Sequence, residues 1–225
     1  MDVNSELITA AAYGDLAGVQ RAIDDGADVN YNLDLSDYSE LDHVGGTALM
    51  FASRGYFWNK PCNGIEIVKL LLEHGADVNI KSLVYGDTAL MYASIYNKSE
   101  IVKLLLEHGA DVNAQNKEGS TALMWPEAVL QTPESVGFLL HYDAVNAQNK
   151  RGEIVKILLD HGVNVNTQNK RGETALMFSN YAKISKIFLD HGAHVNTQDK
   201  NGKTALMYAS DPALMYLQDR HGEHA

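Results

Sequence analysis

The sequence predicts an all-α solenoid, in which helix-turn-helix units stack side by side and short β-hairpin fingers join one unit to the next. The tetrapeptide Thr-Ala-Leu-Met recurs five times, at positions 47–50, 88–91, 121–124, 174–177 and 204–207. Several copies are followed by a leucine-rich segment, a His-Gly pair and then a Val-Asn pair. From Asn30 to Asn196 the asparagines of these pairs lie 49, 34, 33, 20 and 30 positions apart. A spacing near 33 is typical of a stacked repeat array.

The most regular unit covers residues 86–113. Thr88 is expected to cap a first helix over 89–96, because its hydroxyl can accept a hydrogen bond from an unpaired first-turn amide. A second helix begins near Ser99 and leaves few positions for water, so it is expected to be buried on two sides. Gly109 can take the left-handed conformation that ends a helix. One such pair cannot bury its own apolar face and needs neighbours on both sides.

These motifs resemble the ankyrin repeat, whose signature is Thr-Pro-Leu-His, then a leucine-rich helix and Gly-Ala-Asp-Val-Asn. Every copy here has Ala for Pro and Met for His. The loss of the Thr-His hydrogen bond is expected to weaken each unit modestly without changing the fold. The resemblance implies a non-catalytic module that binds a partner protein through its hairpin tips and inner-helix surface. The alternatives are an inhibitory or regulatory subunit of a partner enzyme, a host-directed effector, and a decayed array without a specific ligand.

The whole chain, 1–225, is expected to form one domain. It divides into a cap repeat (3–32), repeats of about 45–80, 85–114 and 118–147, a half-repeat (148–167) and short repeats at 170–197 and 200–225. Pro126 is expected to break the first helix of the fourth repeat. The half-repeat lacks a Thr-Ala-Leu-Met helix altogether. We therefore predict a weak junction between residues 125 and 153.

Composition excludes several classes of function. The net charge of −11 argues against nucleic acid as the main partner, because the field of the whole molecule repels phosphates. The single Cys62 can form neither an internal disulfide nor a cysteine zinc site. No run approaches the about 18 apolar residues of a membrane helix, and the first residues do not resemble a signal peptide. We expect a cytoplasmic monomer without membrane insertion, while delivery into a host cell stays open.

No catalytic set is recognisable, and we expect neither enzymatic activity nor a cofactor. The histidines before the helix-ending glycines suit a structural role at the negative end of a helix; they are His74, His108, His161, His191 and His221. The pairs His191/His194 and His221/His224 could form a surface metal site. Their spacing crosses a helix end, however, and no Cys or patterned carboxylate joins them, so we expect no metal.

Two groups of residues are candidates for partner binding. The first is a basic row at the hairpin tips, made of Lys117, Lys150, Arg151, Lys170, Arg171 and Lys200. The second is aromatic and comprises Tyr56, Phe57 and Trp58, in an insertion between two helices, together with Tyr96. Each has a plainer interpretation, because turns are usually polar and the aromatic insertion could fold over the cap repeat instead. The methionines of the repeated tetrapeptide are similarly interpreted as packing residues, with an adaptable concave groove as the alternative.

Overall fold

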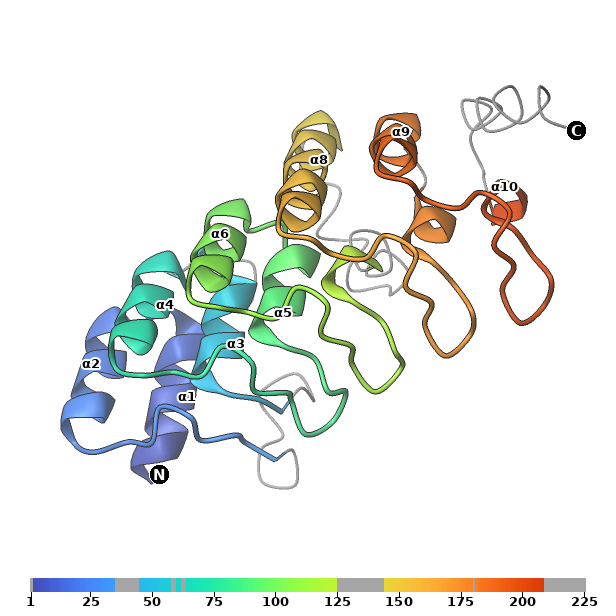
Figure 1. The fold of residues 1–225 in the computed structure, drawn as a ribbon. Helices are drawn as coiled ribbons and strands as arrows, with labels where there is room; N and C mark the ends of the chain where they lie inside the picture. The colour runs from blue at the N-terminus through green and yellow to red at the C-terminus, as the bar shows by residue number, and fades with distance from the viewer. Residues whose placement is uncertain are drawn as a thin grey trace, which may run out of the picture.

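The computed structural model describes residues 2–34, 45–57, 60–61, 64–124, 144–179 and 181–208, with only the backbone described for 56–57, 60–61 and 144–150. The helices stack in chain order from the N-terminal pair onward (Figure 1). Helices lie along one side of the stack, and the fingers project along the opposite edge (Figure 1). Apart from one pair of two-residue strands, the regular structure of the described residues is helical.

Each repeat begins with an inner helix and continues with an outer helix. The inner elements are α1 (Val3–Tyr13), α3 (Ala48–Arg54), α5 (Ala89–Ile95), η2 (Ala122–Met124), η4 (Ala175–Phe178) and α10 (Ala205–Tyr208). The outer helices are α2 (Leu16–Asp24), α4 (Gly64–Glu73), α6 (Ser99–Glu107), α8 (Ala144–Asp160) and α9 (Ala182–Asp190). We number the repeats from one, with α1 and α2 as the first and α10 in the sixth, and each finger by the repeat that it leads into.

The third repeat folds as its sequence predicts. Thr88 caps α5, and its hydroxyl accepts a hydrogen bond from the Met91 amide at 3.4 Å. Helix α6 ends before Gly109, whose φ of +84° lies in the left-handed region that favours glycine. The His108 Nδ1 lies 2.8 Å from the Leu104 carbonyl oxygen. A carbonyl can only accept, so the imidazole donates to the unpaired end of the helix, as predicted.

The repeated tetrapeptide fills the core between neighbouring repeats. Met50, Met91, Met124 and Met177 are only 2%, 0%, 3% and 5% exposed. The plainer interpretation of these methionines as packing residues is therefore confirmed for four of the five. Met207, in α10, is 67% exposed. Its neighbours from 209 onward lie outside the described residues.

The fourth repeat differs from its prediction. The expected repeat at 118–147 and half-repeat at 148–167 are the two ends of one repeat, because α8 runs through their boundary at 147 and packs against both α6 and η2. The described part of its inner helix is the 3-10 turn η2. Residues 125–143, and with them the break predicted at Pro126, lie outside the described residues.

The spacing of contacts between repeats confirms that one repeat is interrupted here. The amide of Asp111 donates to the Asn79 side chain, 32 positions earlier. The equivalent bond to Asn113 comes from Asn164, 51 positions later. Lys103 of α6 also pairs with Glu153 of α8 at 2.8 Å. Helix α8 thus packs against the third repeat, and contacts continue across the predicted junction.

The aromatic insertion of the second repeat begins as a short hairpin. Strand β1 (Tyr56–Phe57) pairs antiparallel with β2 (Lys60–Pro61), and β1 lies against α1 of the cap repeat. This backbone position agrees with the interpretation that the insertion folds over the cap. The inserted residues 35–44 of the second finger lie outside the described residues. None of the helices described in the structure is both long and apolar enough to span a membrane.

Candidate partner-binding surface

The fingers of the third to sixth repeats, residues 81–87, 114–120, 167–173 and 197–203, form a continuous edge that we call the finger row. Backbone hydrogen bonds join each finger to the next: Lys117 N to Tyr85 O at 2.9 Å, Lys170 N to Glu118 O at 2.8 Å, and Lys200 N to Arg171 O at 2.9 Å. The row is visible along the lower edge of the stack in Figure 1. Because every finger is tied to its neighbour, the tips keep a fixed spacing.

One side chain at the base of each later finger fixes its turn. Asn116 Oδ1 accepts from the amides of Glu118 and Ser120, at 3.0 and 2.9 Å. Asn169 and Asp199 repeat this arrangement in the fifth and sixth fingers, with distances of 2.8–3.0 Å. Such short local bonds from Asn and Asp side chains are a common way to hold a turn. The side chains at the tips therefore project from a preorganised backbone.

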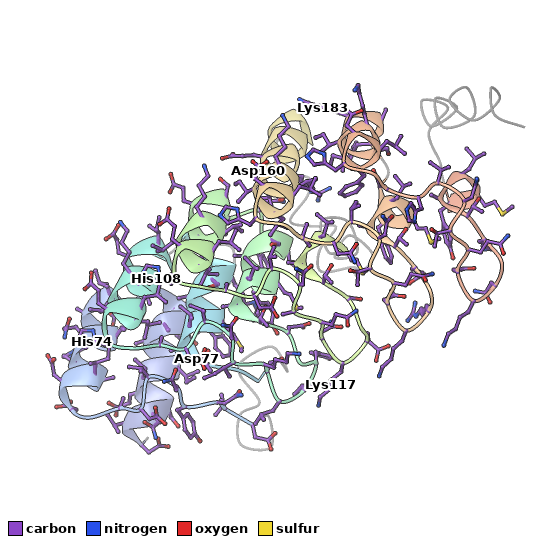
Figure 2. The ribbon with its side chains drawn as sticks, in the orientation of Figure 1. His74, Asp77, His108, Lys117, Asp160 and Lys183 are labelled. Carbon is purple, nitrogen blue, oxygen red and sulfur yellow. The ribbon has the colours of Figure 1, made fainter. Side chains whose placement is uncertain are left out.

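The cations of the fifth and sixth fingers are available to a partner. Lys170, Arg171 and Lys200 are exposed, and no carboxylate in the described part of the chain pairs with them. Lys117 differs, because its Nζ donates to the Leu83 carbonyl oxygen at 2.6 Å. It still lies at the tip of its finger, away from the histidines at the ends of the outer helices (Figure 2). The free positive charge is thus concentrated at the C-terminal end of the row.

Two predicted members of the basic row lie elsewhere. Lys150 and Arg151 are in the middle of α8, not at a hairpin tip. Arg151 is 5% exposed, and its guanidinium carbon lies 6.0 Å from the centre of the Tyr181 ring. The reason is visible at Gly152, which is helical, whereas the finger glycines Gly119 and Gly172 have φ of +78° and +80°. The prediction that these two residues belong to the hairpin tips is wrong.

None of the aromatic candidates that the structure describes joins the finger row. Tyr56 and Phe57 are in β1 with only their backbone described, and Trp58 lies outside the described residues. Tyr96 is half-buried at the C-terminal end of α5, whereas the third finger leads into the N-terminal end of that helix. Its hydroxyl accepts from Arg54 at 3.1 Å, and the guanidinium lies 5.4 Å from the ring centre. Tyr96 thus helps to join the second and third repeats.

The structure adds four residues to the row that the sequence analysis missed. Leu83 and Tyr85 are 47% and 52% exposed at the tip of the third finger. Lys81 and Lys203 are exposed on the third and sixth fingers. A signal was present for the first two, because the third finger has Ser-Leu-Val-Tyr-Gly where the fourth has Asn-Lys-Glu-Gly.

A buried polar cluster lies where the third and fourth fingers meet the helices. Asp87 is 5% exposed, and its carboxylate accepts a hydrogen bond from the side-chain Nδ2 of Asn116 at 2.8 Å. Burial raises the pKa of Asp87, and the Asn116 hydrogen bond opposes part of that change. Burial, followed by the nearby Asp87 charge, also raises the pKa of Tyr92. This cluster is structural, since Asp87 holds the finger residue Asn116 in place.

The sixth finger carries a second hydrogen-bonded pair, in which Asp199 is 6% exposed and Tyr208 is half-buried. Tyr208 donates to Asp199 Oδ2 at 2.6 Å. This bond lowers the pKa of Asp199 and raises the pKa of Tyr208 to about 12. Between the fourth and fifth fingers the surface forms a hollow, lined by Glu118, Ser120, Met124, Asn169, Arg171, Glu173 and Phe178. Arg171 therefore lies at the tip of its finger and also lines this hollow.

The described residues contain no group of three or more His, Cys, Asp or Glu side chains that could hold a metal ion. The Nδ1 atoms of His74, His161 and His191 lie 2.9, 2.7 and 2.7 Å from carbonyl oxygens one turn earlier, as in the third repeat. These histidines therefore have the structural role that the sequence predicts. His221 and His224 lie outside the described residues.

The stacked helix pairs and their aligned fingers define a helix-turn-helix repeat solenoid. A family model described as ankyrin repeats (3 copies) matches residues 59–149 and 140–217. The chain belongs to the ankyrin-repeat family, whose members are generally non-catalytic modules of protein-protein interaction. No curated protein in the comparison matches the chain.

Proposed function

We propose that this protein is a non-catalytic binding module that holds a partner protein against its finger row. One observation carries the proposal: Lys170, Arg171 and Lys200 project from hydrogen-bonded turns without a carboxylate partner in the described structure. Because the backbone of these turns is already ordered, binding a partner requires ordering only of the Lys and Arg side chains. The partner surface that fits them is acidic.

The charge distribution supports an acidic partner despite the negative net charge. Residues 1–124 carry 18 acidic and 8 basic side chains, whereas residues 125–225 carry 11 acidic and 10 basic ones. An acidic surface is therefore repelled by the N-terminal part and repelled far less by the C-terminal part, where the finger cations lie. Such complementarity favours fast association and a fixed orientation, and it weakens as salt is added.

Affinity capture from cell lysates tests this proposal. The bait is the full chain, compared with a variant that carries Lys170→Glu, Arg171→Glu and Lys200→Glu. A matched control reverses three exposed lysines of the outer helices, Lys69, Lys156 and Lys186, and so changes the net charge equally. We expect partners captured by the wild type and the control to be lost from the finger variant. Equal capture by all three would overturn the proposal that the finger row is the binding surface.

A further inference from the structure

We infer that the finger row binds an extended acidic segment of the partner, with a large apolar residue of that segment anchored on Leu83 and Tyr85. This inference rests on the proposed function and names the chemistry of the partner. The row is asymmetric: an exposed apolar pair lies on the third finger, and free cations lie on the fifth and sixth.

The apolar end of the row has the features of an anchor point. Leu83 and Tyr85 occupy a turn, where polar residues and glycine normally dominate. Their backbone is fixed, because Lys117 donates from its amide to the Tyr85 carbonyl and from Nζ to the Leu83 carbonyl. An aromatic and an aliphatic side chain on a rigid support can bury a partner side chain at low entropic cost.

The basic end of the row begins two fingers further on. Lys170 and Arg171 lie on the fifth finger, and Lys200 and Lys203 lie on the sixth. Lys203 also lies 5.4 Å from the centre of the Tyr208 ring, which holds its ammonium group near the row. The fourth finger carries both Lys117 and the exposed Glu118. The acidic residues of the segment are therefore matched to the last two fingers and its apolar residue to the third.

The finger spacing sets the length of the bound segment. The path from one finger tip to the next crosses two residues and one backbone hydrogen bond of 2.8–2.9 Å. The distance between neighbouring tips is therefore at most about 10 Å. The fifth and sixth fingers thus lie at most about 20 Å and 30 Å from the third. An extended chain covers at most about 3.3–3.6 Å per residue, so a separation of about six to nine residues is enough for the segment to reach both ends of the row.

A short peptide segment fits this surface better than a nucleic acid does. A long polyanion would extend over the N-terminal part of the molecule, where acidic side chains exceed basic ones by 18 to 8. The exposed Leu83 side chain also adds nothing to the affinity for the phosphates of a nucleic acid. A segment with one apolar and several acidic residues uses both ends of the row and avoids the acidic part.

Fluorescence anisotropy with synthetic probes tests the inference on the full chain. The first probe is a labelled peptide with Phe at one end, a Gly/Ser spacer and four Glu residues starting seven positions away, made in both chain directions. The second replaces Phe with Ala, and the third places Phe among the Glu residues. We expect the better direction of the first probe to bind about tenfold more tightly than the second and third.

Substitutions separate the two ends of the row. The Leu83→Ser, Tyr85→Ser double variant is expected to bind the first and second probes equally, while the salt dependence of binding is unchanged. Tyr13→Ser is the matched control, because Tyr13 is 52% exposed on α1, away from the row. The triple charge reversal at Lys170, Arg171 and Lys200 is expected to abolish binding of every probe. Circular dichroism checks that each variant is folded.

Three results would overturn the inference. They are an unchanged affinity of the Leu83/Tyr85 variant for the first probe, absence of binding by any probe up to millimolar concentration, and equally tight binding of a single-stranded oligonucleotide of the same charge. The proposed function fails separately, when charge reversal of the finger row leaves lysate capture intact. A different pair of results would leave the proposed function standing and overturn only this inference. In that case the charge-reversed variant loses lysate capture, while the Leu83→Ser, Tyr85→Ser variant binds the first probe as tightly as the wild type does.

Discussion

At the residue scale, four asparagines tie each repeat to the next and form what we call the asparagine ladder. Their Oδ1 atoms accept from backbone amides of the following repeat at 2.8 Å, and their Nδ2 atoms donate to carbonyl oxygens of helix-ending glycines at 2.9–3.3 Å. The ladder consists of Asn30, Asn79, Asn113 and Asn166. Each of these asparagines connects one repeat to the following repeat. The spacing of these Val-Asn pairs in the sequence therefore reflects a hydrogen-bonded contact between neighbouring repeats.

The Asn113→Ala substitution tests one rung. It removes two hydrogen bonds that are open to water, each of which contributes about 0.5–1.5 kcal/mol, so the free energy of unfolding is expected to fall by about 1–3 kcal/mol. Urea denaturation followed by circular dichroism measures this change. Asn196→Ala is the matched control, because Asn196 has the same sequence context but no such bond within the described residues. An equal loss of unfolding free energy in both variants would mean that the asparagine side chain acts within its own repeat and does not act through contacts with the next one.

Asp87 provides a prediction for pH. Burial raises its pKa in the folded chain above the unfolded value of about 3.9. Its contribution to stability is therefore complete below that unfolded value and is lost as the pH rises through the folded pKa. The Asp87→Asn variant has no charge to bury and keeps an oxygen that accepts from Asn116. We expect it to melt at a higher temperature than the wild type at pH 7, with the difference shrinking towards pH 4. A constant difference would exclude desolvation of this carboxylate as the cause.

At the element scale, α8 shows where pattern reasoning succeeded and where it failed. The order of helices in the third repeat could be predicted, because cap, apolar face and ending glycine agreed locally. Residues 144–152 carry the Val-Asn signal of the extended segment, or arm, that follows an outer helix and the Lys-Arg-Gly signal of a finger, yet they form the N-terminal part of α8. In regular repeats the arm follows a glycine with positive φ, whereas Tyr142-Asp143 precedes this segment. Without that helix-ending residue the arm motif does not specify an arm.

The packing of α8 against α6 can be tested by comparing an apolar and a charged contact. Leu158 is completely buried, so Leu158→Ala is expected to cost about 2–5 kcal/mol through lost burial and a cavity. Glu153→Ala removes the exposed pair with Lys103 and is expected to cost at most about 1 kcal/mol. Urea denaturation of both variants measures the two values. A loss below about 1 kcal/mol for Leu158→Ala would contradict the position of α8 as the outer helix of the fourth repeat.

At the scale of the whole molecule, the binding surface was only partly predictable from sequence. Lys117, Lys170, Arg171 and Lys200 could be placed at hairpin tips because each precedes a turn glycine or its equivalent within a regular repeat. The apolar tip was missed, because Ser-Leu-Val-Tyr-Gly departs from the Asn-Lys-Glu-Gly pattern on which the prediction of the tips depends. Which cations are free also depends on contacts between repeats, such as the Lys117 bond to the third finger. Those contacts become known only when the register of the stack is known.

The same dependence on neighbours predicts how fragments of the chain behave. A fragment of residues 1–124 keeps three complete helix pairs, which is about the minimum for a stable repeat array. A fragment of residues 144–208 begins with α8 but lacks α6 and η2, so Ile154, Val155 and Leu158, all fully buried in the whole chain, would face water. We expect cooperative urea unfolding, followed by circular dichroism, for the first fragment and no folded baseline for the second.

The stability of a solenoid is a sum of the stabilities of its repeats and of the interfaces between them. Mixing the two fragments should therefore not restore a folded second half, since the contact of α6 with α8 would have to outweigh the entropy lost on association. A cooperative transition in the isolated second fragment would show that its repeats are stable without the N-terminal part, and would place the main source of stability in the region that carries the free cations.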